Sequence, residues 1–331
     1  MKQKLLDMLA CIKCGGGLSS TDFDGGELID GELTCKGCGA KYPVTNGIPR
    51  FVEPDNYASS FGYQWNLFRK EQIDSFNGTT LSADRFWTET GWSRDELKDK
   101  WVLDAGCGAG RFLDVASTTE ADIVGIDISS AIDAAKDNLK DRENLHFVQA
   151  SIYDLPFCKS TFDRVYCIGV IQHTPDPVQS LLSISEMVKP EGKIAVTIYE
   201  RRKWYTMLFS KYWLRPVTKR MKKETLLKAI QMVMPIAFPV TDILFRIPLV
   251  GRVFVFAMPV ANYVHEKQLN REQRYNWAIL DTFDMLSPAF DQPMTEPEAI
   301  KPLTEAGIDV SRLTYGALNL IGKRQAKSET L

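Results

Sequence analysis

The sequence predicts an α/β protein built on a parallel sheet, with a small cysteine-rich module before the sheet and a helical insertion after it. Residues 101–200 alternate short apolar runs with helical stretches, which is the pattern of a parallel α/β sheet. Residues 1–53 are rich in Gly and Cys, and residues 201–262 are first basic and then apolar. A chain of 331 residues suits about two domains.

Charge and targeting signals exclude some classes of protein. The chain has 40 Lys and Arg against 42 Asp and Glu, a net charge of −2, which gives no global support for a nucleic-acid binder. We recognise no signal peptide and therefore expect a cytoplasmic protein, in a compartment where disulfides are rare. The seven cysteines are then metal ligands, buried residues or reactive thiols.

The N-terminal module contains two Cys-x-x-Cys pairs with 20 residues between them, formed by Cys11, Cys14, Cys35 and Cys38. Two such pairs complete the tetrahedral sulfur site that Zn²⁺ prefers, and four protein ligands leave no open position, so the metal is structural. The alternative is a set of buried or redox-active thiols. An Asn46-Gly47 turn predicts a hairpin that closes a small β module.

The first strand of the α/β region, residues 101–105, runs into a loop with Gly106, Gly108 and Gly110. A dinucleotide fingerprint fails in both registers of this loop, and a phosphate-binding Gly-Lys-Ser/Thr loop is absent. Asp104 ends the strand, and its carboxylate would repel a pyrophosphate at the start of the next helix. The site suits S-adenosylmethionine, which carries a sulfonium, an ammonium and a carboxylate but no phosphate.

Four further strands are expected at 122–127, 145–149, 162–168 and 192–199. The second strand of the sheet ends in Asp127. A carboxylate at that place can accept hydrogen bonds from both hydroxyls of a ribose.

The stretches VLDAGCGAG, VGIDIS, DLPF, FDRVYCIGVIQHTPDP and KPEGKI follow one another in this order. Together they resemble the class I S-adenosylmethionine-dependent methyltransferases that carry a type 11 domain. The N-terminal module resembles the zinc ribbons found before some methyltransferases and in their small activator proteins. The resemblance implies a Rossmann-like sheet of seven strands in the order 3-2-1-4-5-7-6, and S-adenosylhomocysteine as product.

The same resemblance assigns cofactor-binding residues. It places Asp104, Gly106 and Gly108 at the methionine end. It gives Asp127 the ribose and Ile128 the adenine face. Ser151 and Ile152 meet the adenine edge, and because many relatives have Asp where Ser151 stands, a hydroxyl or backbone contact replaces the usual carboxylate there. The alternative is an α/β fold whose loop no longer binds a ligand.

Methyl transfer needs an aligned nucleophile and, for some acceptors, a base, which leaves a weak sequence signature. His173 follows the fourth strand at the edge where ligands bind and is our candidate base; the alternative is a structural loop histidine. Candidate lid or substrate residues precede and follow the core, and ordinary helix packing is the alternative for each. They are Tyr63, Gln64, Trp65, Trp277 and Asp281.

The insertion begins with nine Lys and Arg and no Asp or Glu over residues 201–223. Its longest uncharged runs, 229–241 and 253–265, have 13 residues each, whereas a membrane span needs about 20. Basic residues with interleaved aromatic rings suit peripheral contact with an anionic membrane surface through residues 201–262. A helical cap over the active site is the alternative, and RNA is a weaker third.

We therefore expect a methyltransferase acting at oxygen or nitrogen of a small-molecule, glycan or lipid-linked acceptor, in the cytoplasm and peripherally at the inner membrane surface. One alternative is an rRNA or tRNA methyltransferase with a zinc module; another is a non-catalytic zinc-ribbon interaction protein with a degenerate domain. The expected units are a zinc ribbon, a helical lid segment, the cofactor-binding core, the insertion and the C-terminal completion of the fold: 1–53, 54–100, 101–200, 201–270 and 271–331.

Overall fold

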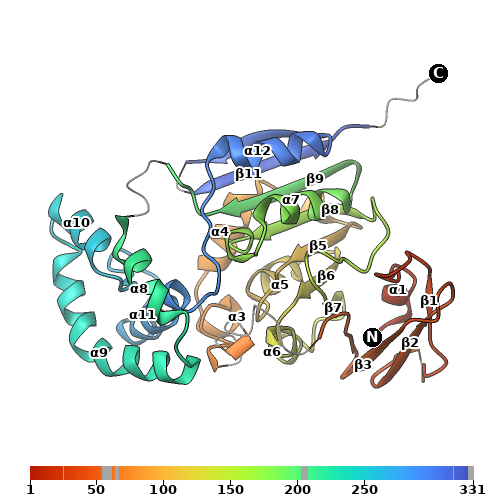
Figure 1. Cartoon of the computed structure of the whole chain (residues 1–331), viewed down its shortest axis with the longest axis horizontal. Helices are drawn as coiled ribbons and strands as arrows, with labels where there is room; N and C mark the ends of the chain where they lie inside the picture. Colours follow the sequence, from red (N-terminus) through yellow and green to blue (C-terminus); the bar gives the residue numbers. More distant parts are fainter. Residues whose placement is uncertain (25, 54–61, 64–66, 203–207, 316, 327–331) are drawn as a thin grey trace.

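The computed structural model of the chain describes residues 1–331 except 25, 54–61, 64–66, 203–207, 316 and 327–331. Two β-sheets and a group of helices make up the described part (Figure 1). The large sheet lies in the centre, with the small N-terminal sheet on one side of it and the helices of the insertion on the opposite side.

The small sheet has four antiparallel strands in sequence order, preceded by α1 (Gln3–Leu6). The strands are β1 (Leu18–Ser19), β2 (Gly31–Cys35), β3 (Lys41–Thr45) and β4 (Ile48–Pro49). The predicted hairpin joins β3 to β4. Asn46 and Gly47 have φ of 50° and 64°, the left-handed conformations that a tight two-residue hairpin turn requires.

The large sheet has seven strands in the order β10-β11-β9-β8-β5-β6-β7, which is the predicted order 3-2-1-4-5-7-6. Strands β5 to β9 run parallel to one another, and β11 runs antiparallel to both β9 and β10. The strands are β5 (Trp101–Ala105), β6 (Asp122–Asp127), β7 (Leu145–Gln149), β8 (Phe162–Ile168), β9 (Val188–Ile198), β10 (Ile308–Thr314) and β11 (Leu318–Arg324).

Helices cover both faces of this sheet because alternate strand residues point to opposite sides. On β5, Val102 joins one apolar cluster and Leu103 joins another. The first cluster contains side chains of α4 (Leu81–Thr90), α5 (Arg111–Ala116) and α6 (Ala131–Asn138). The second contains those of α7 (Pro177–Glu186) and α12 (Glu296–Glu305). Short helical turns are α3 (Asp74–Asn77), η1 (Asp95–Leu97) and η2 (Ile171–His173).

The insertion forms a helical layer with its own core. It consists of α8 (Ser210–Thr218), α9 (Lys223–Leu244) and α10 (Val250–Ala257), and α9 and α8 both pack against α11 (Arg271–Leu286). Leu227 and Phe238 of α9 are buried with Ile279 and Phe283 of α11. The helical layer therefore continues past residue 270, and α11 connects it to the large sheet.

The N-terminal module packs against the β7 edge of the large sheet. The backbone N–H of Phe51 donates to the carbonyl of Gln149 on β7 at 2.8 Å. The guanidinium of Arg50 donates to the Gln149 side chain at 2.7 Å and forms an ion pair with Asp133 at 2.6 Å. The module also shares a buried apolar cluster with the sheet, so the two units form a continuous core.

Candidate functional site

The four predicted zinc ligands lie together in the small sheet. The sulfur atoms of Cys11, Cys14, Cys35 and Cys38 are all within 4.8 Å of one another. Cys11 and Cys38 are 3.6 Å apart, and Cys14 and Cys35 are 3.5 Å apart. Tetrahedral zinc with bonds of about 2.3 Å to sulfur separates its ligands by about 3.8 Å. The residues therefore fit a structural Zn²⁺ site.

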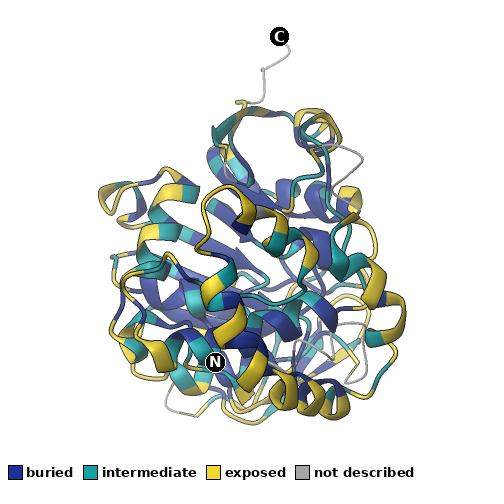
Figure 2. Ribbon diagram, turned by 90° about the vertical axis from the view of Figure 1, so that its left-hand side faces the viewer, coloured by how far each residue is buried: buried dark blue, intermediate teal, exposed yellow. Residues whose placement is uncertain are grey.

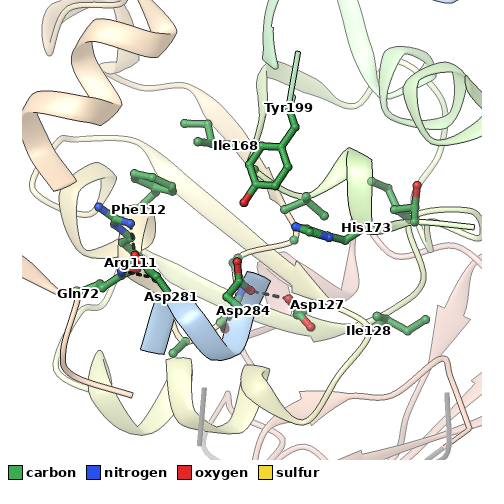
Figure 3. A pocket seen from close by; sticks show the side chains of 18 of the residues that line it. Gln72, Arg111, Phe112, Asp127, Ile128, Ile168, His173, Tyr199, Asp281 and Asp284 are labelled. Carbon is green, nitrogen blue, oxygen red and sulfur yellow. Dashed lines mark hydrogen bonds between the residues drawn. The ribbon is translucent and has the colours of Figure 1, made fainter. Parts of the chain in front are cut away.

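The second site is a cavity of about 370 Å³ at the carboxyl ends of the parallel strands. It lies where β5 neighbours β8, the point at which the strand order reverses, and ligands of open α/β sheets bind at such points. Figure 3 shows Asp127 and Ile128 on one side of the cavity and Arg111, Gln72 and Asp281 on the other.

Asp127 is held in place by the loop that follows β5. One of its carboxylate oxygens accepts the backbone N–H of Gly108 at 3.0 Å, and the other accepts the N–H and hydroxyl of Ser129. Burial raises the pKa of Asp127 despite these hydrogen bonds. The side chain faces the cavity, as a ribose-binding carboxylate must (Figure 3).

The glycine loop packs closely against Val170, another residue of the cavity wall. Gly106 has a φ of +91°, and a Cβ atom there would lie 2.6 Å from the side chain of Val170. No other residue fits this position without moving Val170, which itself lines the cavity. Gly106 therefore lines the cavity with its backbone alone.

Most predicted cofactor residues line the cavity: Gly106, Gly108, Asp127, Ile128 and Ile152. Asp104 and Ser151 are not among the lining residues. Asp104 is buried under the loop beside the Tyr166 hydroxyl, and burial raises its pKa well above the usual range. The Ser151 hydroxyl accepts a hydrogen bond from the backbone N–H of Tyr153 at 3.2 Å, so it is engaged within its own turn. The roles given to these residues stay predictions.

His173, the candidate base, lines the cavity and ends η2. Its Nδ1 lies 3.1 Å from the carbonyl oxygen of Phe290, and its ring stands edge-on to Tyr199 with 5.4 Å between centroids. Because a carbonyl oxygen only accepts, Nδ1 carries the proton in this hydrogen bond, and Nε2 is the basic nitrogen of the neutral ring.

Two carboxylates of α11 complete this part of the wall. Asp281 accepts from the amide of Gln72 at 3.2 Å and from the hydroxyl of Tyr263. Burial raises the pKa of Asp281 to about 6 although Arg111 and Arg85 oppose the shift. Burial also raises the pKa of Asp284 to about 6, with His173 acting in the opposite direction.

The other predicted lid residues lie elsewhere. Trp277 is buried in α11, where its indole N–H donates to the carbonyl of Glu71 at 2.8 Å. It therefore holds α11 against the segment that contains Glu71 and does not line the cavity. The ring of Tyr63 lies 6.2 Å from that of Phe283 in the insertion core. Gln64 and Trp65 lie outside the described residues.

Several lining residues were not predicted as site residues: Gln72, Arg85, Arg111, Tyr199 and Tyr263. Arg111 follows the glycine loop directly, and this position in the sequence was enough to predict it as a site residue. Its guanidinium donates to Ser82 at 3.0 Å and to Gln72 at 2.9 Å. Burial lowers its pKa to about 10, so it remains a cation at neutral pH.

Two family models match the chain. Residues 103–196 match the model of a methyltransferase domain, and residues 2–47 match the model of Trm112p-like proteins. Both matches fall on the regions whose motifs predicted them.

Curated relatives match over about a third of the chain. A ubiquinone biosynthesis O-methyltransferase of Coxiella burnetii is 32% identical over 107 residues, which are 32% of this chain and 46% of that protein. An uncharacterized protein of Synechococcus is 33% identical over 104 residues, 30% of this chain and 25% of that protein. In both cases the chain spans less than half the length of the relative.

Among solved structures, the complex of the Haloferax volcanii Trm112 methyltransferase activator with a methyltransferase has a TM-score of 0.43 at 15% identity, covering 80% of this chain and 97% of that one. A SAM-dependent methyltransferase of Aquifex aeolicus has a TM-score of 0.40 at 14% identity, covering 82% and 98%. Scores below 0.5 carry no argument about activity or substrate.

The family matches, the strand order and the four-cysteine cluster agree with one another. The cavity also has residues that fit S-adenosylmethionine at the expected strand ends. Residues 103–196 therefore match the methyltransferase domain family and carry the class I strand order, and residues 2–47 match Trm112p-like proteins and hold the four-cysteine cluster.

Proposed function

We propose that this protein transfers the methyl group of S-adenosylmethionine to a hydroxyl oxygen of a small, partly apolar acceptor. One observation carries the proposal. A single cavity has a ribose-binding candidate, Asp127, on one side and a candidate base, His173, on its wall together with the Asp284 carboxylate. Donor and acceptor can therefore be held in one water-poor space, where methyl transfer requires them.

The cofactor half of the cavity follows from the strand ends. When bound, S-adenosylmethionine supplies a methyl carbon that is activated by the positive sulfur. Asp127 accepts the ribose hydroxyls, and Ile128 and Ile152 provide apolar contacts for the adenine. Arg85 and Arg111 supply cations for the ligand's carboxylate on the wall beyond the glycine loop.

The acceptor half supplies a base. A hydroxyl acceptor would lose its proton as it is methylated, so a residue of the chain must take up that proton. Nε2 of His173 takes this proton, because Nδ1 is engaged with the Phe290 carbonyl. The Asp284 carboxylate, which lines the same cavity, stabilises the imidazolium that results.

The walls of this half describe the acceptor. Phe112, Ile168, Met285 and the ring of Tyr199 are apolar, whereas Asp281 and its hydrogen-bonded neighbours are polar. This combination suits a ring or chain that carries a hydroxyl group, including the end of a lipid-linked molecule. Two of the curated relatives, from Coxiella burnetii and Aspergillus nomiae, are O-methyltransferases, which supports oxygen as the methylated atom.

Labelled S-adenosylmethionine and a panel of phenolic, glycan and lipid-linked alcohols test the proposal. We expect one acceptor class to gain a labelled methyl ether. His173→Ala should lower turnover by about 10²–10⁴-fold while calorimetry shows near-normal binding of S-adenosylhomocysteine.

His265→Ala is the matched control, because His265 is exposed and does not line the cavity. The proposal is wrong if wild-type protein methylates only nitrogen or nucleic acid, or if His173→Ala is as active as the control.

A further inference from the structure

The insertion exposes an unusual amount of apolar surface. Among the described residues, most large apolar side chains that are exposed lie between residues 208 and 255. On α9 they recur every three or four residues, so they share one face of the helix. They are Met232, Val233, Ile236, Val240 and Ile243. Figure 2 faces the side of the molecule on which α9 and α10 lie and shows exposed segments recurring along the helices there.

The other two helices of the insertion also expose large apolar side chains. Trp213 and Val217 of α8 are 70% and 66% exposed, and Leu249 and Val253 at α10 are 86% and 63% exposed. We call the exposed apolar residues of α8, α9 and α10 the outer face. Ordinary soluble proteins seldom leave a patch of this kind uncovered, so a partner is expected there.

The opposite face of α9 is already occupied. Leu226, Ile230, Met234 and Phe238 are buried in the core that α9 forms with α11. By length and composition α9 is apolar enough to cross a membrane. Because one of its faces packs on α11, the other can enter a bilayer only with the helix lying parallel to the membrane plane.

Charge identifies the partner. Residues 201–262 contain twelve Lys and Arg but two Asp and Glu. Some of the cations are neutralised within the protein, as in the ion pairs of Arg201 with Glu298 and of Lys211 with Asp291. A second group is not: Lys219, Arg220 and Lys222 are exposed in the turn between α8 and α9 and form no ion pair with a described residue.

We propose that the outer face docks on the surface of an anionic phospholipid bilayer, with the apolar side chains in the boundary layer and this cationic turn at the headgroups. An apolar stripe beside basic residues and an exposed Trp is the composition of helices that bind in the membrane plane. A second copy of the chain is the poorer occupant, because a two-fold contact would bring the same cations together.

The position of the outer face suits an acceptor that comes from the membrane. α9 packs directly on α11, and Asp281, Asp284 and Met285 of α11 line the cavity. The bilayer would then lie about one helix diameter, roughly 10 Å, from the cavity wall. This step rests on the proposed methyl transfer, whereas docking itself does not.

Sedimentation of the full chain with vesicles tests docking without donor or acceptor, so its failure is separate from a failure of methyl transfer. We expect binding to phosphatidylglycerol-rich vesicles and little binding to pure phosphatidylcholine. Ile236→Glu/Ile243→Glu should weaken binding by about tenfold or more. Replacing Lys219, Arg220 and Lys222 by Gln should weaken it by about 100-fold at low salt.

Ile29→Glu/Val178→Glu is the matched control, because these exposed apolar residues lie outside the insertion. It should bind vesicles like wild type, and circular dichroism should show that all variants are folded. The proposal is overturned if wild type stays soluble with anionic vesicles at low salt. It is equally overturned if the control loses as much binding as the α9 variant, or if light scattering shows a stable dimer whose outer face excludes lipid.

Discussion

The buried carboxylate of Asp284 makes the stability of the protein depend on pH. Burial raises its pKa to about 6 from the usual 3.8, so the folded protein binds a proton there that the unfolded chain releases. The contribution of this group to the free energy of unfolding is greatest at low pH. It is lost as the pH rises from the pKa in the unfolded chain, 3.8, through the pKa in the folded protein, about 6. The pKa of Asp281 is raised in the same direction.

Asp284→Asn removes this loss because an amide does not ionise. We compare the melting temperature of the variant minus that of wild type at each pH. We expect this difference to be about 2–4 °C larger at about pH 7.5 than at about pH 4. Thermal unfolding of both proteins without ligand, at a series of pH values, gives this difference. A difference that stays constant, or that falls as the pH rises, would show that Asp284 is not a destabilised carboxylate.

At the scale of elements, the zinc ribbon depends on its metal because so short a module cannot bury enough apolar surface. Cys35→Ser removes one of the four sulfur ligands. We expect wild type to contain about one zinc per chain and the variant to have lost most of it.

Elemental analysis of the purified proteins makes this measurement, and Cys158→Ser is its control because Cys158 is an exposed cysteine outside the cluster. Full zinc content in Cys35→Ser would rule out the four-cysteine site.

The ribbon also reaches the cofactor end of the cavity through one chain of hydrogen bonds. Arg50 donates to the Gln149 side chain at 2.7 Å, and Gln149 donates to the carbonyl of Ile128 at 3.1 Å. Ile128 lines the cavity beside Asp127. The ribbon therefore helps to fix the backbone on which the adenine contact depends.

Arg50→Met should weaken S-adenosylhomocysteine binding by about three- to tenfold, the scale of one hydrogen bond to a charged group. Lys41→Met is a suitable control, because the ion pair of Lys41 with Glu32 is exposed and stays within the ribbon. Calorimetry that finds equal affinities for the two variants would mean that the ribbon does not act on the cavity.

At the scale of the whole molecule, the sequence predicts what is local. Asp127 and Gly106 lie in a strand, loop and helix that follow one another directly, and the order of the strands follows from the motifs they carry. Tyr199 and Tyr263 were not predicted as site residues because distant elements bring them to the cavity. One follows β9, and the other lies between α10 and α11.

The basic insertion makes the same point for charge. Residues 201–223 contain nine cations and no Asp or Glu, but the structure pairs part of this set with distant carboxylates. Asp291 pairs with Lys211, 80 residues away, and Glu298 pairs with Arg201, 97 residues away. Composition cannot show such partners, because they are defined by the packing of α8 and α12 against the rest of the chain.

Binding of the methyl donor depends on the whole arrangement of sheet, loop and cavity, and Asp127 is the residue that joins them. The most direct test is calorimetry of S-adenosylhomocysteine binding to wild type, Asp127→Ala and the control Asp141→Ala, whose side chain is exposed and does not line the cavity. We expect wild type and the control to bind alike and Asp127→Ala to bind about 10- to 100-fold more weakly, with its fold intact. Wild-type protein that binds no S-adenosylhomocysteine, or a folded Asp127→Ala variant with unchanged affinity, would contradict the account.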